Sequence, residues 1–138
     1  MVLGMCLLVI DSNRQHTLLY KRKMLASFTE VDFCSSTEQA LRKLRRRKYD
    51  AIILSHQLKN SSGLTAYKTL RQEGYKGDII IAVTGQDKSD IRRSYNGISG
   101  IINKCLYEED FNLTIRKFLN STLPEDSSRK LTDVPTRS

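Results

Sequence analysis

The chain has 138 residues, of which 39% are hydrophobic and 7% aromatic, a composition typical of one ordinary globular domain. Its apolar opening, residues 1–10, lacks the basic flank and the length of a signal peptide, and no stretch is long enough to span a membrane. Three scattered cysteines indicate a reducing compartment, so we expect a cytoplasmic protein. The formal net charge of +8 favours an acidic partner, which can be nucleic acid, an anionic membrane surface or an acidic protein face.

Short apolar runs alternate with stretches that have helical periodicity. The runs predict buried strands at residues 6–10, 31–34, 50–55, 78–84 and 98–103. The periodic stretches predict helices over residues 13–28, from Ser36 or Thr37 onward, after Gly63 as far as Gly74, and over 88–95 and 108–122. Five strands alternating with five helices predict a doubly wound α/β fold, with a parallel five-stranded sheet in the order 2-1-3-4-5, as in flavodoxin-like proteins.

The composition changes near the end of the chain. From Pro124 onward Glu, Asp, Ser, Arg, Lys, Thr and Pro dominate, and Leu131 and Val134 are the only apolar side chains apart from proline. We therefore expect a domain over residues 1–122 and a polar tail over 123–138 that is disordered or becomes ordered on a partner.

The central strand carries the most informative pattern. Tyr49-Asp50 is followed by the apolar residues Ala51-Ile52-Ile53-Leu54, and then by Ser55 and a polar loop that ends at Gly63. Open α/β sheets bind their ligands at the carboxyl ends of the strands, which places Ser55 at the mouth of a crevice.

This pattern resembles the phosphoacceptor strand of bacterial response-regulator receiver domains (CheY-like), and the resemblance extends over roughly residues 5–122. It implies a role for six positions at strand ends. Asp11 and Ser12 match the two acidic magnesium ligands, Ser55 the phosphorylated aspartate, Thr84 and Lys104 the residues that contact the phosphoryl group, and Ile101 the aromatic switch residue. One carboxylate of three is therefore present, and the aromatic ring is replaced.

These replacements predict that phosphorylation chemistry is lost. Magnesium prefers hard oxygen ligands, and one carboxylate is a weak site for it. The Ser55 hydroxyl has no neighbouring general base except His56, whose side chain is expected on the opposite face of the strand. We predict no catalytic residue, no metal, no cofactor and no enzymatic activity. Lys104 is free to pair with Asp11, or to bond with Ser55 and Thr84, which predicts a locked pocket.

Five residues in or near this pocket have both a structural and a functional interpretation. Asp11, Thr84 and Lys104 are inherited polar groups at strand ends, or together they bind a small anion. His56 is an exposed loop residue or an acid–base group. Cys105, where receivers usually have proline, is a small replacement side chain or a thiol activated by Lys104.

Two surfaces are candidates for partner binding. The resemblance implies an interaction surface on the fourth helix, fifth strand and fifth helix, which also suggests a homodimer. Its residues are Lys88, Asp90, Arg93, Ser94, Tyr95, Ile102 and Arg116. The second surface is a basic segment whose cations are Arg42, Lys43, Arg45, Arg46, Arg47 and Lys48.

The basic segment has three interpretations. It is a solvated helix face with extended aliphatic stems, a docking site for an acidic protein, or a patch that binds nucleic acid through phosphates and is extended by Arg71, Arg92, Arg93 and Arg116. A nucleic-acid role is disfavoured because Tyr49 is the only stacking aromatic near the segment and no helix-turn-helix follows.

The sequence thus favours a pseudo-receiver, a domain that acts in signal transduction by protein–protein contact without phosphorylation. The alternatives are a nucleic-acid-binding or regulatory module that uses the basic segment, and an atypical receiver that senses a small anion at Thr84 and Lys104. A flavin binder on the same fold is disfavoured, because no glycine-rich or hydroxyl-rich phosphate loop follows the first strand.

Overall fold

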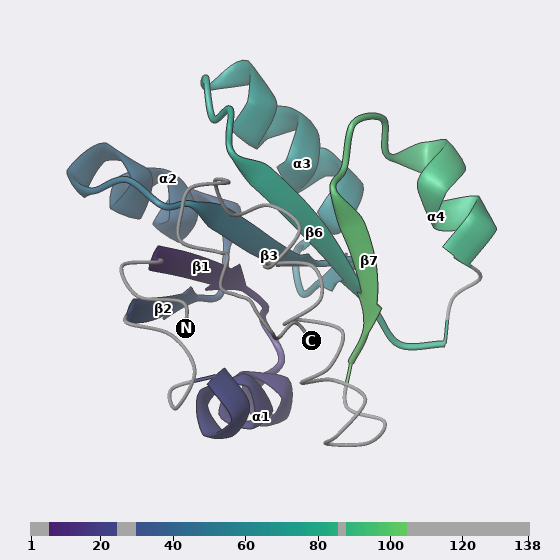
Figure 1. Cartoon of the computed structure of the whole chain (residues 1–138), viewed down its shortest axis with the longest axis horizontal. Coiled ribbons are helices and arrows are strands. Elements are labelled where there is room, and N and C mark those ends of the chain that lie inside the picture. The colour runs from purple at the N-terminus through teal and green to yellow at the C-terminus, as the bar shows by residue number, and fades with distance from the viewer. Residues whose placement is uncertain (1–5, 25–29, 86–87, 105–138) are drawn as a thin grey trace, which may run out of the picture.

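A computed structural model of the chain describes residues 6–24, 30–85 and 88–104. Five parallel strands form one sheet in the order β2-β1-β3-β6-β7 (Figure 1). Their bounds are Cys6–Ile10 for β1, Glu30–Cys34 for β2, Ala51–Ser55 for β3, Asp78–Val83 for β6 and Gly100–Asn103 for β7. Counted along the chain these are the five predicted strands, so the predicted order 2-1-3-4-5 is confirmed.

Helices cover both faces of this sheet. Their bounds are Arg14–Met24 for α1, Thr37–Arg46 for α2, Gly63–Gln72 for α3 and Lys88–Ser94 for α4. Figure 1 shows α1 on one face and α2 and α3 on the other, which is the arrangement that right-handed crossovers produce in a doubly wound sheet.

The buried strands are apolar on both sides, which explains why their sequences do not alternate. Leu8 and Ile52 belong to the core under α2 and α3, whereas Leu7 and Ile53 belong to the core on the other face with Tyr20 of α1. All four aliphatic side chains are essentially inaccessible to solvent. The sheet therefore has a packed apolar layer on each face, and the polar residues of the central strands β1, β3 and β6 lie only at the strand ends.

Two helices begin at a serine that caps them. The Ser36 side chain accepts a hydrogen bond from the Gln39 N–H, and the Ser62 side chain accepts one from the Thr65 N–H. Each bond satisfies one of the free N–H groups in the first helical turn. The predicted start at Ser36 or Thr37 agrees with α2, which begins directly after its cap.

A small antiparallel hairpin, formed by β4 (Gln57–Leu58) and β5 (Ser61–Ser62), lies between β3 and α3 and was not predicted. Gly63 ends it at a very close approach of the backbone. A Cβ atom at this position would lie 2.5 Å from the Ser55 carbonyl oxygen and 2.6 Å from the Tyr95 hydroxyl. Glycine at position 63 thus allows α3 to start directly against the end of β3.

The predicted helix over 108–122, the domain limit at 122 and the tail over 123–138 lie outside the described residues. Cys105 and Arg116 lie outside them as well. Within residues 6–24, 30–85 and 88–104, no helix has the length and apolar character needed to cross a membrane.

Candidate functional site

The carboxyl ends of the strands bring the predicted pocket residues to one edge of the sheet. Asp11 follows β1, Ser55 ends β3, Thr84 follows β6 and Lys104 follows β7. The register places Ser55 beside Ala82 and places Val83 beside Asn103. Parallel strands end at the same edge, so residues far apart in the chain meet there.

Lys104 lies at the centre of this pocket. Its ammonium nitrogen Nζ donates to Asp11 Oδ2 over 2.9 Å and to Ser55 Oγ over 2.8 Å. The side chains of Lys104 and Asp11 are 5% and 1% exposed, so the ion pair is shielded from water. A buried charge is stable only when it is paired and hydrogen-bonded, and this lysine is both.

Ser55 stands at the position of the phosphorylated aspartate and uses all of its hydrogen-bonding capacity. Its Oγ accepts from Lys104 Nζ and from the Gln57 N–H at 3.3 Å, and it donates to the Gln57 carbonyl over 2.8 Å. A hydroxyl has one donor hydrogen and two acceptor lone pairs, so no lone pair remains for attack on phosphorus.

Asp11 and Ser12, at the two magnesium-binding positions, are also engaged. Asp11 Oδ1 accepts from the Asn13 N–H at 2.9 Å, on the oxygen that Lys104 does not use. Ser12 Oγ accepts from the Lys59 N–H at 2.8 Å and joins the loop after β1 to the loop after β3. Both residues thus hold loops at the edge of the sheet.

The pocket residues do not fit the magnesium ion that this site would hold in a receiver. Asp11 is the sole carboxylate among the pocket residues, and its Oδ2 is paired with the Lys104 ammonium group. Within the described part of the chain, no group of three or more His, Cys, Asp or Glu is placed to hold a metal. A hydroxyl and an ammonium group do not provide the set of hard oxygens that magnesium requires.

The two remaining pocket positions differ in exposure. Thr84 is exposed at the end of β6. Ile101, at the position of the aromatic switch residue, is 7% exposed and packs in the core under α2 and α3. An aliphatic side chain in this core has no ring that can exchange between a buried and an exposed state.

His56 lies in a different environment from the exposed loop that the sequence suggested. It is half-buried rather than exposed, and its Nδ1 lies 2.8 Å from the Tyr95 hydroxyl. The Tyr95 ring also makes an edge contact with Tyr67, with ring centroids 5.5 Å apart. Burial raises the pKa of Tyr95 well above its ordinary value, so the phenol that bonds to His56 keeps its proton at neutral pH.

The chain has two histidines, and both predict a loss of stability at acidic pH. Burial, and then the nearby charge of Lys104, lowers the pKa of His56 and of His16, while Asp11 opposes this shift at His16. The unfolded chain therefore binds more protons than the folded one below about pH 7, and the stability falls as the pH decreases from there. We expect the midpoint of thermal unfolding to decrease between about pH 7.5 and 5.5.

Replacing the histidines tests this expectation. The double variant His16→Gln/His56→Gln should show a clearly smaller decrease over the same pH range, and each single variant an intermediate one. An unchanged pH dependence in the double variant would assign the effect to carboxylates instead.

The interaction surface implied by the resemblance is present in part. Lys88, Asp90, Arg93 and Ser94 are exposed on α4, and Asp90 forms an ion pair with Arg93. Tyr95 and Ile102, however, are each 1% exposed, so their expected exposure was wrong. Tyr95 turns inward to His56 and Tyr67, and Ile102 belongs to the core that includes Tyr20 of α1.

The basic segment lies on α2 and the turn after it. Arg42, Arg45, Arg46, Arg47 and Lys48 are exposed, and Lys43 is half-buried. Arg47 is held in ion pairs with Glu30 and Asp32 of β2.

Arg71, considered as an extension of the basic segment, has a different role. It donates to the carbonyls of Tyr75 and Gly77 at 2.9 Å and packs over the Tyr67 and Tyr75 rings. It therefore fixes the turn between α3 and β6 rather than adding a free charge to the surface.

The model of the response regulator receiver domain family matches residues 7–116. The chain belongs to this family. Receiver domains of two-component signalling act through protein partners. A comparison with curated proteins finds no significant match.

Solved structures share the fold. A two-component response regulator from Clostridium difficile is 22% identical with a TM-score of 0.72, and the match covers 85% of this chain and 97% of that one. The receiver domain from Methylobacillus flagellatus is 17% identical, with a TM-score of 0.68 and coverage of 83% and 98%. TrrA from Thermotoga maritima, solved with Mg²⁺ and BeF, is 21% identical, with a TM-score of 0.67 and coverage of 83% and 98%.

Proposed function

We propose that this receiver domain acts without phosphorylation, as a cytoplasmic pseudo-receiver that binds a protein partner and has no enzymatic activity of its own. The observation that carries the proposal is the contact set of Lys104, whose ammonium group bonds to both Asp11 and Ser55 in a buried pocket. The lysine that would neutralise a phosphoryl group is thereby occupied by the protein itself.

The chemistry of the pocket supports this proposal. Phosphoryl transfer to a receiver needs an oxygen nucleophile with a free lone pair and cations to balance the charge of the phosphate. Both lone pairs of Ser55 Oγ accept hydrogen bonds, and Asp11 is the only carboxylate among the pocket residues. Each requirement is therefore unmet in the described pocket.

Exposed residues provide surfaces for a partner. Lys88, Asp90, Arg93 and Ser94 of α4 lie on the face through which relatives commonly signal, and they give this face mixed charge. The basic segment on α2 provides a second, cationic surface. The net charge of +8 favours a partner with an acidic face on either surface.

The proposal predicts that the wild-type chain does not respond to phosphoryl donors. After incubation with Mg²⁺ and acetyl phosphate, intact-mass spectrometry should detect no added phosphoryl group. With Mg²⁺ and beryllofluoride, amide NMR signals of residues 11, 55, 84 and 104 should stay in place, because Lys104 remains paired with Asp11.

Two other results of this experiment would contradict the proposal. A stable mass gain of one phosphoryl group would show a functional acceptor. Shifts localised at Thr84 and Lys104 without a mass gain would instead favour the alternative of an atypical receiver that senses a small anion.

A further inference from the structure

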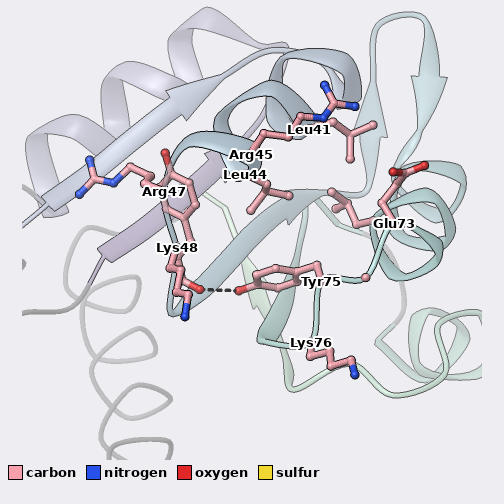
Figure 2. Close-up of a pocket in the computed structure, with 11 residues that line it drawn as sticks. Leu41, Leu44, Arg45, Arg47, Lys48, Glu73, Tyr75 and Lys76 are labelled. Atoms are coloured by element: carbon pink, nitrogen blue, oxygen red, sulfur yellow. Dashed lines mark hydrogen bonds between the residues drawn. The ribbon is translucent and has the colours of Figure 1, made fainter.

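A groove of about 540 Å³ lies between α2 and α3, at the end of the sheet where the strands β3 and β6 begin. It is therefore at the opposite end of the strands from the Lys104 pocket. Leu41, Leu44, Leu70 and Tyr75 form its floor, and Figure 2 shows Leu41, Leu44 and Tyr75 from the two sides of the groove. Leu70 is fully buried, whereas the other three are half-buried and leave apolar surface in contact with water.

Charged residues surround this apolar floor. Arg45, Arg47, Lys48 and Lys76 line the groove together with a single acid, Glu73, and all five are exposed. Arg47 is engaged by Glu30 and Asp32 of β2, outside the groove. Among the described residues, Arg45, Lys48 and Lys76 form no ion pair, so three cations are available to a ligand.

Contacts between the two walls hold the groove in shape. The Tyr75 hydroxyl donates to the Tyr49 carbonyl over 3.2 Å and connects the segment after α3 to the segment after α2. Arg71 packs over the Tyr75 ring, with 5.9 Å from its guanidinium carbon to the ring centroid, and donates to the Tyr75 carbonyl. A preformed groove lowers the entropic cost of binding a flexible ligand.

We propose that the α2–α3 groove binds an acidic linear peptide of the protein partner. One aliphatic or aromatic side chain of the peptide inserts against Leu44 and Tyr75, and flanking Asp or Glu residues contact Arg45, Lys48 and Lys76. This inference rests on the proposed function as a protein-binding module and names the chemistry of the partner. Such pairing of an apolar anchor with a charged rim is the usual arrangement of peptide sites.

The apolar side chains of the floor favour a peptide over nucleic acid as the ligand. Phosphates would pair well with the rim, but polar base edges would then lie against leucine side chains. Nucleic-acid grooves offer exposed aromatic faces on which bases stack, whereas of the two tyrosines that line this groove Tyr49 is buried and only Tyr75 is half-buried.

A peptide selection tests the proposal. Random peptides of about 12 residues, displayed on phage, are selected on the immobilised full-length chain, and enriched sequences are synthesised with a fluorescent label. We expect enriched peptides to combine one or two apolar residues with several acidic residues. Their affinities are then measured by fluorescence polarisation on wild type and two charge-reversal variants.

The two variants differ in position and not in charge. Arg45→Glu/Lys76→Glu changes the groove, whereas Arg46→Glu/Lys68→Glu changes exposed residues of α2 and α3 that do not line it. Each variant lowers the formal net charge from +8 to +4, because each reversal removes two charges. Each also places one acid in the last turn of α2, so the unfavourable interaction with the helix dipole is matched.

We expect the groove variant to weaken peptide binding by about ten-fold or more, and the control variant by less than about three-fold. Equal losses in both variants would overturn the groove assignment and leave the protein-binding role intact. Enrichment of no acidic peptide would overturn the assignment as well. The assignment to a peptide would also be overturned if a single-stranded RNA of about 20 nucleotides displaced the peptide and lost affinity only in the groove variant.

This experiment is independent of the phosphorylation test. The peptides are selected and titrated on a chain that has met no phosphoryl donor. Phosphoryl uptake in the other experiment would therefore contradict the proposed function alone, and the result at the groove would stand separately.

Discussion

The variant Ser12→Asp/Ser55→Asp should gain phosphorylation that the wild-type chain lacks. The two substitutions bring the pocket from one carboxylate to three, beside a lysine that is already in place. A carboxylate oxygen at position 55 would attack the phosphorus of acetyl phosphate, acetate would leave, and magnesium would balance the charge. We expect a mass gain of one phosphoryl group that depends on Mg²⁺ and is removed by hydroxylamine, as an acyl phosphate should be.

Magnesium should also stabilise this variant against heat. Three clustered carboxylates repel one another in the absence of metal, so the midpoint of thermal unfolding should rise when Mg²⁺ is added. The control Ser61→Asp/Ser94→Asp adds the same charge at exposed positions outside the pocket and should show neither effect. A double variant that is folded but gains neither magnesium stabilisation nor a phosphoryl group would show that the lost chemistry depends on more than these two serines.

The second large effect concerns the buried ion pair. Lys104→Met should lower the free energy of unfolding by about 3–5 kcal/mol, because it leaves the Asp11 carboxylate buried and without its cation. Asp11→Asn should cost a similar amount, since the ammonium group of Lys104 then has no counter-charge. The asparagine retains an oxygen that can accept from the Asn13 N–H, so that bond is kept.

Urea denaturation of the two single variants and the double variant measures the coupling. We expect the double variant to cost less than the sum of the single variants by about 2 kcal/mol or more. The exposed pair Asp90–Arg93 provides the control, since the cycle of Asp90→Asn and Arg93→Met should give a coupling below about 0.5 kcal/mol. An additive cycle at Asp11 and Lys104 would mean that the pair does not hold the pocket.

The fold was predictable from sequence because the signals that determine it are local. Each strand of the sheet is a short apolar run bounded by polar residues, and handedness rules leave few orders for five such strands. The edge at which Asp11, Ser55, Thr84 and Lys104 meet follows from the same reasoning. The predicted strand ends lie within two residues of the observed ones, because the change from apolar to polar residues is abrupt there.

What the sequence did not predict depends on contacts between distant residues. His56 and Tyr95 are 39 positions apart, and no local pattern indicates that their side chains bond. Tyr95 directly follows the polar helix α4, so its burial becomes visible only when the end of α4 is placed against Tyr67. The β4–β5 hairpin escaped prediction because each of its strands is only two residues long. The tight turn from Ser55 to Gln57, which leads into this hairpin, was not predicted either. The glycine at position 63 was the one signal of a close approach there.

The contacts of Tyr95 have a consequence for how information would pass through this protein. They tie the end of α4 to the loop after β3 through His56, and to α3 through Tyr67. In a receiver whose output face changes on phosphorylation, the strength of the signal depends on the fraction of molecules that are phosphorylated. In a domain whose output face is held by constitutive contacts, the strength of the signal depends on the number of copies. Only synthesis and degradation change how many copies are available to the partner. Under the proposed role, the cell would adjust this signal through the abundance of the protein.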